Sequence, residues 1–535
     1  MQISPGNSPL NVRGAMRLRV EPPKVAPGVD LLLTAGGDER ILPDPVTRRN
    51  RYGTMATPCP DEIFLSSSTA SAITPRAYGA VETAWTALCA EANGDRPGLE
   101  AWFDGVRARL LDLFGIEGAD VVLTGSGTEA ELLSVAIARS VLGGPLTNIV
   151  LAPTETGSGV LRAAGGAHFL DSTPFGQSHG AGGALGGWAH ADIAAAGVEI
   201  RDADGDLRPP AEVDAEARRR THAAIEAGRS VLLHLLQTSK TGRSGLTAAA
   251  ASQILAEAPQ KVLVVADCCQ LRCSRERVRE FLARGFLVAV TGSKFFGGPP
   301  FCGALLLPAP ILARIWRLAL PEGLADYSSQ LDWPPGLRAK ARLGWTSQAN
   351  LGLGLRWIAA LSEMERFFAL PDDLRSGILV YFENEIRRRA DRLAPLQEIA
   401  ADPPSSVKTL QSILPYVMTH PDGAPFSAAE TAAIHARLRL PCATSAPGDQ
   451  ALAQVFHLGQ PVAVGPRTAL RVCASAPIVS EIAERLIGGA SLGMAFAQWG
   501  RDLDALFDKW RWLMEAASAA RRAAPPAARK DRRRA

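Results

Sequence analysis

The sequence predicts an α/β protein whose large domain contains a mostly parallel sheet and is followed by a smaller α+β domain. Two observations predict this class. Short runs of consecutive apolar residues, which suit strands buried on both faces of a sheet, alternate with stretches of helical character. The chain has 535 residues, enough for two or three domains with substantial cores. After about Pro321 the pattern becomes more mixed, as expected for the smaller domain.

Five apolar runs are expected to be strands of the large sheet, and the segments between them are expected to be helices. The runs are 121–123, 148–151, 231–234, 262–265 and 287–290. The clearest helical segments are 129–142 and 247–258. Residues 157–205 are rich in Gly, Ala and His and interrupt the alternation, so we expect them to form an insertion.

Five segments follow from these patterns. Residues 1–60 are rich in Pro, Gly and Arg and are expected to be a partly irregular N-terminal extension. The large domain is expected over 61–325 and the small C-terminal domain over 326–495. In 496–522, apolar residues recur at helical spacing and predict an amphipathic helix. The basic tail, 523–535, is expected to be disordered.

Charge and composition argue against several classes of protein. The net charge is +3, and residues 519–535 alone carry seven Arg or Lys and one Asp, so the rest of the chain is slightly acidic. The body therefore lacks the basic footprint of a nucleic-acid-binding protein. No apolar run reaches the roughly 18 residues of a membrane span. The eight cysteines suggest no disulfide framework, and we expect a cytoplasmic location.

A glycine-rich turn lies between an expected strand and an expected helix. It reads Thr-Gly-Ser-Gly-Thr-Glu-Ala and spans 124–130. Backbone N–H groups at the start of a helix bind anions, and Ser126 or Thr128 can add a hydroxyl. The turn is not a Walker loop, because no Gly-Lys-Ser/Thr follows. It fits a phosphate site, a loose dinucleotide fingerprint or a plain glycine-rich connection.

An acidic residue ends the fourth apolar run. Asp267 directly follows residues 262–266, and Gln270 comes three residues later. A carboxylate at the carboxyl end of a parallel strand points into the usual ligand crevice of an α/β sheet. There it can hold a protonated ring nitrogen, although an Asp at this place can also cap the next helix.

A lysine follows the fifth apolar run. Thr291, Ser293 and Lys294 come directly after it and precede a turn rich in Phe, Gly and Pro. Lysine is seldom buried without a role, and desolvation frees its amine to form an imine. The alternative is a surface lysine after an edge strand.

The order of the three motifs is more specific than any one of them. A phosphate turn, then an Asp at a strand end, and then a Lys at the next strand end is the order that a pyridoxal phosphate (PLP) site requires. The 27 residues from Asp267 to Lys294 fit one strand–helix–strand crossover. An NAD-binding oxidoreductase would have no use for the last two elements.

On these motifs the sequence resembles the class V aminotransferases of PLP-dependent fold type I, a group that includes cysteine desulfurases, selenocysteine lyases and kynureninases. The resemblance runs from about Phe64 to Ile487 at low identity. It implies the aspartate-aminotransferase-like fold of the PLP-dependent transferases, with 61–325 as the PLP-binding domain. It also implies a homodimer and a small-molecule amino-acid substrate.

The resemblance implies a role for each matching residue. Lys294 would hold the cofactor as a Schiff base and shuttle the Cα proton, and Asp267 would keep the ring nitrogen protonated, so these two are the expected catalytic residues. Arg471 would bind the substrate's α-carboxylate through its guanidinium. No metal site is expected. The expected cofactor contacts are Gly127, Thr128, Gln237, Asp267, Gln270, Thr291, Ser293 and Lys294.

Other positions leave alternatives open. Thr156 stands where the family stacks an aromatic ring or His on PLP. Lys240 is an extra lysine close to the expected ring, either functional or a solvated loop residue. Cys442 lies where cysteine desulfurases carry a mobile nucleophilic Cys, and it also fits an incidental buried thiol. His234 is expected to be an ordinary strand residue.

These expectations favour a PLP-dependent enzyme with aminotransferase-class chemistry, because Thr156 replaces the His of the desulfurases. A cysteine desulfurase-like, selenocysteine lyase-like or other β-eliminating lyase is the runner-up. A non-catalytic scaffold with a PLP-enzyme fold is a further alternative, and the intact pair of Asp267 and Lys294 argues against it. No nucleic-acid or membrane partner is expected.

Overall fold

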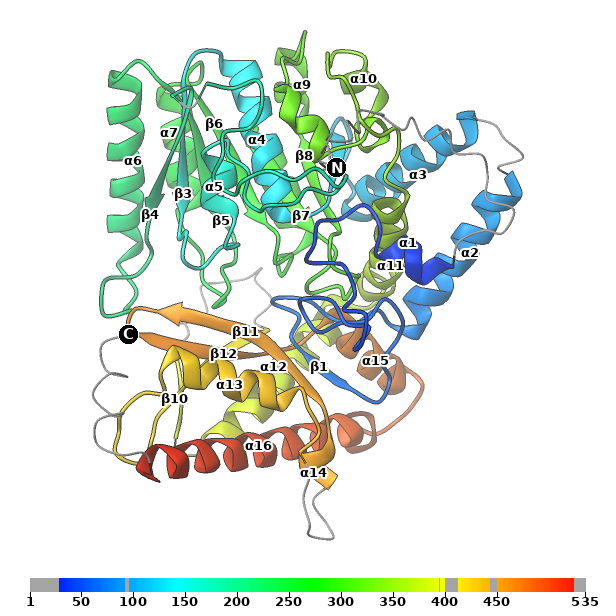
Figure 1. Ribbon diagram of the computed structural model, residues 1–535, viewed down its shortest axis with the longest axis vertical. Coiled ribbons are helices and arrows are strands. Elements are labelled where there is room, and N and C mark those ends of the chain that lie inside the picture. Colours follow the sequence, from blue (N-terminus) through cyan, green and yellow to red (C-terminus); the bar gives the residue numbers. More distant parts are fainter. Residues whose placement is uncertain are drawn as a thin grey trace, which may run out of the picture.

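The computed structural model describes residues 28–91, 96–189, 191–393, 395–399, 412–442 and 450–523. A seven-stranded sheet occupies the upper half of the molecule in Figure 1, and a five-stranded sheet occupies the lower half. The first 27 residues of the expected N-terminal extension, and all but the first residue of the expected basic tail, lie outside the described residues.

The large sheet has the strand order β2-β8-β7-β6-β5-β3-β4. Only β8 runs antiparallel to its neighbours, so the sheet is mostly parallel as the sequence predicted. All five expected strands are present in it. Its strands are β2 (Asp120–Thr124), β3 (Leu146–Leu151), β4 (Ile193–Val198), β5 (Ser230–Leu236), β6 (Val262–Cys268), β7 (Leu287–Thr291) and β8 (Gly303–Leu307).

The apolar runs form strands because both faces of the sheet are covered. In β6, Val262 and Val264 belong to one hydrophobic cluster, whereas Leu263 and Val265 belong to a second cluster on the other face. Full burial of such a side chain contributes roughly 1.5–3 kcal/mol. Helix α4 covers the second face. The helices that follow the parallel strands β2 to β6 are α4 (Gly127–Leu142), α5 (Val160–Ala164), α6 (Pro210–Glu226), α7 (Ala248–Glu257) and α8 (Arg275–Ala283).

The expected insertion at 157–205 is partly wrong. Its first residues form α5, and Ile193–Val198 forms β4, the edge strand that pairs in parallel with β3. The strand reads Ile-Ala-Ala-Ala-Gly-Val, and Ala and Gly have low β propensity, so the sequence did not reveal it. Only the loop between α5 and β4 is an insertion into the alternating strands and helices.

The five-stranded sheet has the order β1-β11-β12-β10-β9 and is antiparallel except where β1 pairs with β11. Strand β1 therefore joins the small sheet, although it lies near the start of the segment expected to form the large domain. The strands are β1 (Ile63–Leu65), β9 (Leu396–Glu398), β10 (Ile413–Met418), β11 (Phe456–Val464) and β12 (Arg467–Cys473).

The longest helix, α16 (Leu492–Ala523), crosses the lower edge of the molecule in Figure 1 and covers the expected amphipathic segment. It buries Leu503, Leu506 and Trp510, and Nε1 of Trp510 donates to Sδ of Met418 on β10 at 3.1 Å. No helix among the described residues is long and apolar enough to cross a membrane. The remaining helices are α1 (Val29–Leu33), α2 (Pro75–Glu91), α3 (Arg96–Phe114), α9 (Ala309–Arg314), α10 (Pro335–Arg338), α11 (Leu351–Phe368), α12 (Asp372–Ala390), α13 (Ala428–Leu438), α14 (Gln450–Ala453) and α15 (Ala476–Ile487), with short 3₁₀ helices at Glu322–Asp326 and Gln330–Asp332.

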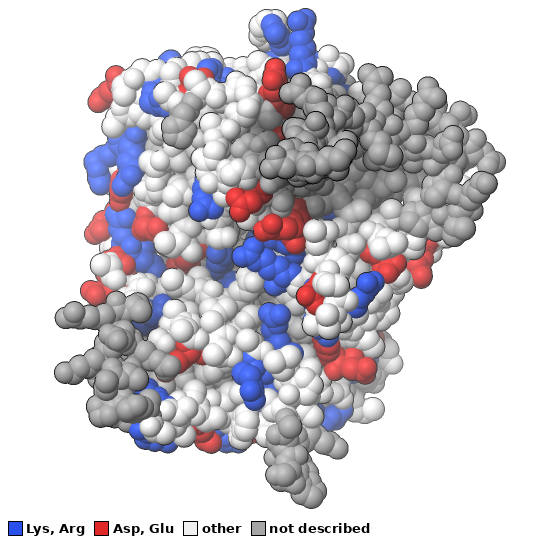
Figure 2. Space-filling model, in the orientation of Figure 1, with Lys and Arg blue, Asp and Glu red and all other residues white. Residues whose placement is uncertain are grey.

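Helices α2, α3 and α11 pack against one another beside the large sheet (Figure 1). On the face of the molecule shown in Figure 2, acidic and basic side chains are interspersed.

Candidate active site

A cavity of about 170 Å3 lies at the carboxyl ends of β5, β6 and β7. Gln460 on β11 also lines it, so both sheets contribute to its wall. Because parallel strands end at the same edge of a sheet, motifs that are far apart in the sequence meet here. The predicted site residues that line the cavity are Gly127, Thr128, Asp267, Gln270, Thr291, Ser293 and Lys294.

The turn after β2 places the start of α4 at this cavity. Ser126 caps the helix by accepting a hydrogen bond from the Glu129 amide at 3.4 Å. A Cβ on Gly127 would lie 2.6 Å from Sγ of Cys269, so this position suits glycine. The N–H groups of the first helical turn and the Thr128 hydroxyl are therefore beside a space that can receive an anion.

Asp267, at the end of β6, is held from two sides. Its Oδ1 accepts a hydrogen bond from the Cys269 amide at 2.8 Å, and its Oδ2 lies 3.4 Å from Nε2 of His234 on β5. Burial opposes ionisation of this carboxyl, but the hydrogen bond and charge of His234 and the charge of Lys294 lower its pKa to about 2. Asp267 is therefore a carboxylate at neutral pH.

A second buried acid stands behind His234. Oε2 of Glu131 lies 3.9 Å from Nε2 of His234, and Oε1 of Glu131 accepts a hydrogen bond from Asn148 at 2.5 Å. Burial opposes protonation of the imidazole, yet Asp267 and Glu131 raise the pKa of His234 overall. His234 is a strand residue as the sequence predicted, but its contact with Asp267 was missed, since only the register of β5 against β6 reveals it.

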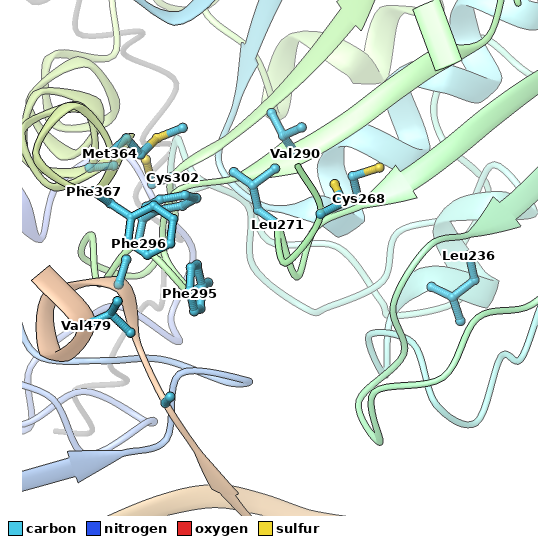
Figure 3. Packing of buried hydrophobic residues seen from close by; sticks show 14 of the residues in the cluster. Leu236, Cys268, Leu271, Val290, Phe295, Phe296, Cys302, Met364, Phe367 and Val479 are labelled. Carbon is cyan, nitrogen blue, oxygen red and sulfur yellow. The ribbon is translucent and has the colours of Figure 1, made fainter. Parts of the chain in front are cut away.

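Lys294 is held by the two residues that follow it. Phe295 and Phe296 are buried, and their rings lie 5.3 and 5.6 Å from the ring of Phe367 on α11. Figure 3 shows this aromatic cluster beside Met364 and Cys302. The loop after β7 is thus fixed on one side, and Lys294 faces the cavity on the other.

The polar side chains beside Lys294 differ in which hydrogen-bonding groups remain available to a ligand. Thr291 donates its hydroxyl to the Cys269 carbonyl at 2.6 Å, so it can only accept from a ligand, whereas Ser293 lines the cavity. Gln270 donates one amide hydrogen to the Ser68 carbonyl at 3.0 Å. An amide NH₂ has two hydrogens, so the second can be donated into the cavity.

Gln237 does not join the site. It follows β5 and does not line the cavity, and its Oε1 accepts a hydrogen bond from Nε of Arg277 on α8 at 3.2 Å. Thr238 lines the cavity at this point of the chain, whereas Gln237, the amide expected beside the cofactor ring, does not. Side chains alternate along an extended chain, so neighbouring residues point to opposite sides.

Arg471, on β12, lies behind the wall rather than in it and is 1% exposed. Its Nε and Nη2 donate to the Gln460 carbonyl at 3.1 and 2.5 Å, and Nη2 also reaches Oγ1 of Thr69 at 3.1 Å. Its Nη1 donates to the Lys240 carbonyl at 3.2 Å. Burial lowers the pKa of Arg471 to about 10, which leaves it charged at neutral pH.

The N-terminal segment contributes two residues that the sequence did not single out. Arg40 and Tyr52 line the cavity. Arg40 forms an ion pair with Asp38 at 2.6 Å, and its guanidinium lies over the ring of Phe301 at 5.0 Å. No sequence pattern in the segment signals this role, because the contact of Arg40 with Phe301 joins residues more than two hundred positions apart.

The cysteines differ in position. Cys442 is 4% exposed, donates its amide to the Leu452 carbonyl at 2.9 Å and does not line the cavity. Cys269 does line it, but burial and the charge of Asp267 raise the pKa of its thiol well above the ordinary value. Among the described residues, no group of three His, Cys, Asp or Glu could hold a metal ion.

Comparison with known proteins identifies the fold. Neither a family model nor a curated protein matches the chain. Among solved structures, a NifS-like protein covers 85% of this chain and 99% of its own at 10% identity, with a TM-score of 0.52. Mouse CSAD covers 84% of this chain and 83% of its own at 13% identity, with a TM-score of 0.50. An alanine–glyoxylate aminotransferase from Nostoc sp. covers 86% and 96% at 14% identity, with a TM-score of 0.49.

Identities of this size establish the fold alone. The first two likenesses agree with the strand order and with the mostly parallel sheet. The chain has the fold type I architecture of the PLP-dependent enzymes, which is the fold that the sequence predicted.

Proposed function

We propose that this protein is a PLP-dependent enzyme that acts on an amino-acid substrate, with aminotransferase-class chemistry and Lys294 as the residue that carries the cofactor. The observation behind the proposal is that Asp267, Lys294 and the start of α4 face one cavity. Each suits a different part of the same cofactor: Asp267 suits the ring nitrogen, Lys294 the aldehyde carbon, and the start of α4 the phosphate.

The residues around the cavity fit PLP. Asp267 is an anion of pKa about 2 and suits a protonated ring nitrogen. Gly127 has no Cβ to collide with Sγ of Cys269, and it lines the cavity beside the hydroxyl of Thr128. Ser293 can add a second hydroxyl to a phosphate, and the remaining amide hydrogen of Gln270 suits the phenolic oxygen.

The chain's own residues would divide the work of the reaction. When bound, PLP supplies an electron sink for the negative charge that develops at Cα. The Asp267 carboxylate would accept a hydrogen bond from the ring nitrogen, and His234 would help to keep that carboxylate ionised. Nζ of Lys294, as a free amine, would accept the Cα proton and later return it.

Two observations favour amino-group transfer over sulfur transfer. Sulfur transfer needs a thiolate that reaches the substrate. Cys442 is buried away from the cavity, and the thiol of Cys269 is held in its protonated form by burial. Amino-group transfer needs no thiol, so the residues that do line the cavity suffice for it.

A panel of amino acids tests the proposal. The PLP-loaded protein is incubated with each amino acid, and pyridoxamine phosphate, keto acids, sulfide and carbon dioxide are measured. Equal amounts of pyridoxamine phosphate and keto acid are expected in a single turnover. Release of sulfide or pyruvate without pyridoxamine phosphate would instead support the β-eliminating lyase. A homodimer is also proposed, and light scattering after size-exclusion chromatography tests it.

A further inference from the structure

The cavity contains a second lysine besides Lys294. Lys240 follows β5, and its side chain is half-buried in the cavity wall. Burial, followed by the charges of Arg471 and Lys294, lowers the pKa of Lys240 to about 8, and the charge of Glu155 opposes this shift. At neutral pH it remains mostly protonated, so a positive charge faces the cavity.

The backbone of Lys240 is fixed on both sides. Its amide donates to the Glu155 carbonyl at 2.9 Å, and its carbonyl accepts from Nη1 of Arg471 at 3.2 Å. The tight turn that follows is closed by hydrogen bonds from the Ser239 amide to the Arg243 carbonyl at 2.6 Å and from the Gly242 amide to the Ser239 carbonyl at 3.1 Å. The side chain of Lys240 is thus presented from a rigid loop.

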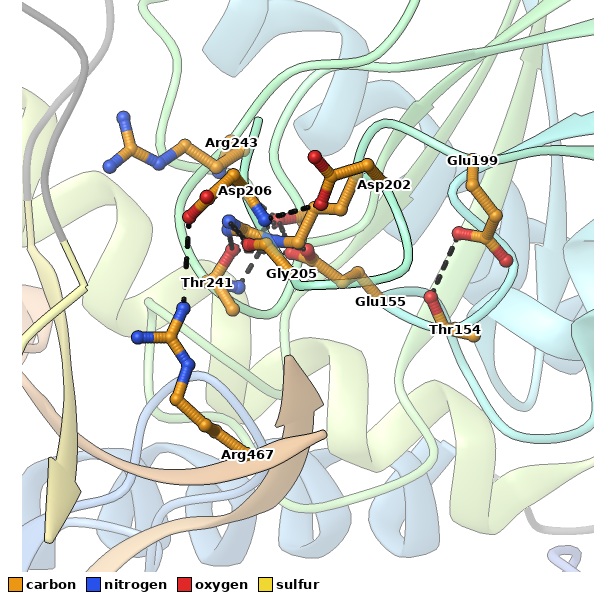
Figure 4. A network of polar contacts seen from close by, with 11 residues as sticks. Thr154, Glu155, Glu199, Asp202, Gly205, Asp206, Thr241, Arg243 and Arg467 are labelled. Carbon is orange, nitrogen blue, oxygen red and sulfur yellow. Dashed lines mark hydrogen bonds and ion pairs between the residues drawn. The ribbon is translucent and has the colours of Figure 1, made fainter. Parts of the chain in front are cut away.

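The Glu155 carboxylate, whose charge acts on Lys240, is hydrogen-bonded to other groups. Glu155 accepts hydrogen bonds from Nε of Arg201 at 2.5 Å, from the Ser239 hydroxyl at 2.6 Å and from the Thr241 hydroxyl. Figure 4 shows Glu155 within this network, next to Thr241. Among the described residues, the Lys240 ammonium forms no ion pair. A half-buried cation without a partner carries a desolvation cost that a bound anion would offset.

Two anions would enter this cavity if the proposed function holds, the cofactor phosphate and the substrate carboxylate. The phosphate has its own place at the start of α4, beside Gly127 and Thr128. Lys240 lies instead on the loop after β5, where Gln460 and Arg471 of the small domain approach. The carboxylate is therefore the anion that matches Lys240.

Four of the five N–H groups of Arg471 are engaged within the protein. All three of its guanidinium nitrogens donate to the Gln460 carbonyl, the Lys240 carbonyl or the Thr69 hydroxyl. We propose that the Lys240 ammonium binds the α-carboxylate of the substrate, and that Arg471 is a positioning residue that holds the Lys240 backbone. This inference rests on the proposed function for the identity of the substrate, but carboxylate binding by Lys240 can be measured without turnover.

The first experiment is lysine labelling of the PLP-loaded wild-type protein with a neutral acetylating ester, with each lysine followed by mass spectrometry. Propionate is the probe, and propionamide is its uncharged control. Propionate is expected to protect Lys240 several-fold, propionamide is not, and the exposed Lys261 serves as the internal control. Equal labelling of Lys240 with both compounds would overturn the proposal.

The second experiment compares variants by KM and kcat. Lys240→Gln is expected to raise KM for amino acids by about 30-fold, as loss of a buried charge partner does, with PLP content unchanged. Amines without a carboxylate should show no such rise, Lys240→Arg should restore most of the affinity, and Lys261→Gln should behave as wild type. If Arg471→Gln alone removes the preference for carboxylates, and Lys240→Gln keeps it, Arg471 binds the carboxylate itself and the proposal is wrong.

The two proposals fail in different ways. If no amino acid reacts but propionate still protects Lys240, the proposed function is wrong and the carboxylate site is supported. If amino acids react but propionate does not protect Lys240, only the carboxylate site is wrong.

Discussion

His234 and Asp267 form a buried pair beneath the candidate active site, with 3.4 Å between Nε2 of His234 and Oδ2 of Asp267. The Leu151 amide donates to Nδ1 of the same ring at 3.4 Å. This contact assigns the ring hydrogen to Nε2, where it faces the carboxylate. His234 therefore stabilises the ionised form of Asp267, which is the form that a pyridinium nitrogen needs.

Replacing His234 by Gln should raise the pKa of Asp267 from about 2. A depressed carboxyl pKa stabilises the folded protein above the unfolded value of about 3.8, and this contribution is lost as pH falls towards 2. The difference in Tm between wild type and His234→Gln should therefore be largest above about pH 4 and shrink below it. The acid limb of the kcat profile should also move to higher pH. A pH-independent difference in Tm would mean that His234 matters only for packing.

Asp267→Asn tests the carboxylate itself. The variant should keep bound PLP through the remaining contacts but lose about 10- to 100-fold in kcat, which is the range expected for a lost charge-assisted hydrogen bond. Cofactor content by absorbance and kcat by product formation separate the two effects. Full activity in this variant would show that another group manages the ring nitrogen.

Lys294 is expected to be the only attachment point of the cofactor. Borohydride reduction of the PLP-loaded protein, followed by peptide mapping, should place the cofactor on the peptide that contains residues 291–295. Lys294→Ala should lose the covalent product, and Lys240→Ala, which removes the other lysine of the cavity, should retain it. A reduced adduct on Lys240 would contradict the assignment.

The sequence predicted the parts of the site that follow strand ends. Asp267 and Lys294 end or follow continuous apolar runs, and such runs can be recognised without knowing the register. The contact of His234 with Asp267 requires the pairing of Leu236 with Asp267 across parallel strands, which no local pattern encodes. The roles of Arg40 and Tyr52 depend on how an irregular segment packs, which for the same reason was not predicted.

Gly127→Ala should weaken the binding of PLP. The new Cβ would meet Sγ of Cys269 at 2.6 Å, and overpacking of this kind costs about 1–3 kcal/mol. Titration with PLP should show the loss, and Cys269→Ala in the same chain should recover part of it by removing the sulfur. Gly105→Ala, on the open side of α3, is the matched control, because nothing lies within 4 Å of its added Cβ. If Gly127→Ala, its combination with Cys269→Ala, and Gly105→Ala all bind PLP equally well, this turn does not bind the phosphate.

Cys442→Ser separates the two leading functions. If the enzyme transferred sulfur through Cys442, a thiolate would have to reach the substrate, and Cys442 is 4% exposed and lies outside the cavity. Its amide also donates to the Leu452 carbonyl, which ties this residue to α14. We therefore expect Cys442→Ser to transfer amino groups at the wild-type rate, since no step of that chemistry needs a thiol.

Cys442→Ser is also expected to destabilise the protein by about 1–3 kcal/mol, because it buries a hydroxyl, and thermal unfolding measures this loss. Cys89→Ser is the control, because Cys89 is exposed and its replacement should change neither stability nor rate. Sulfur transfer would be established by two results together: the wild type releases sulfide from cysteine, and Cys442→Ser, with the cofactor still bound, does not. In that case the region around Cys442 would have to open during the reaction, and the aminotransferase assignment would be replaced by that of a desulfurase.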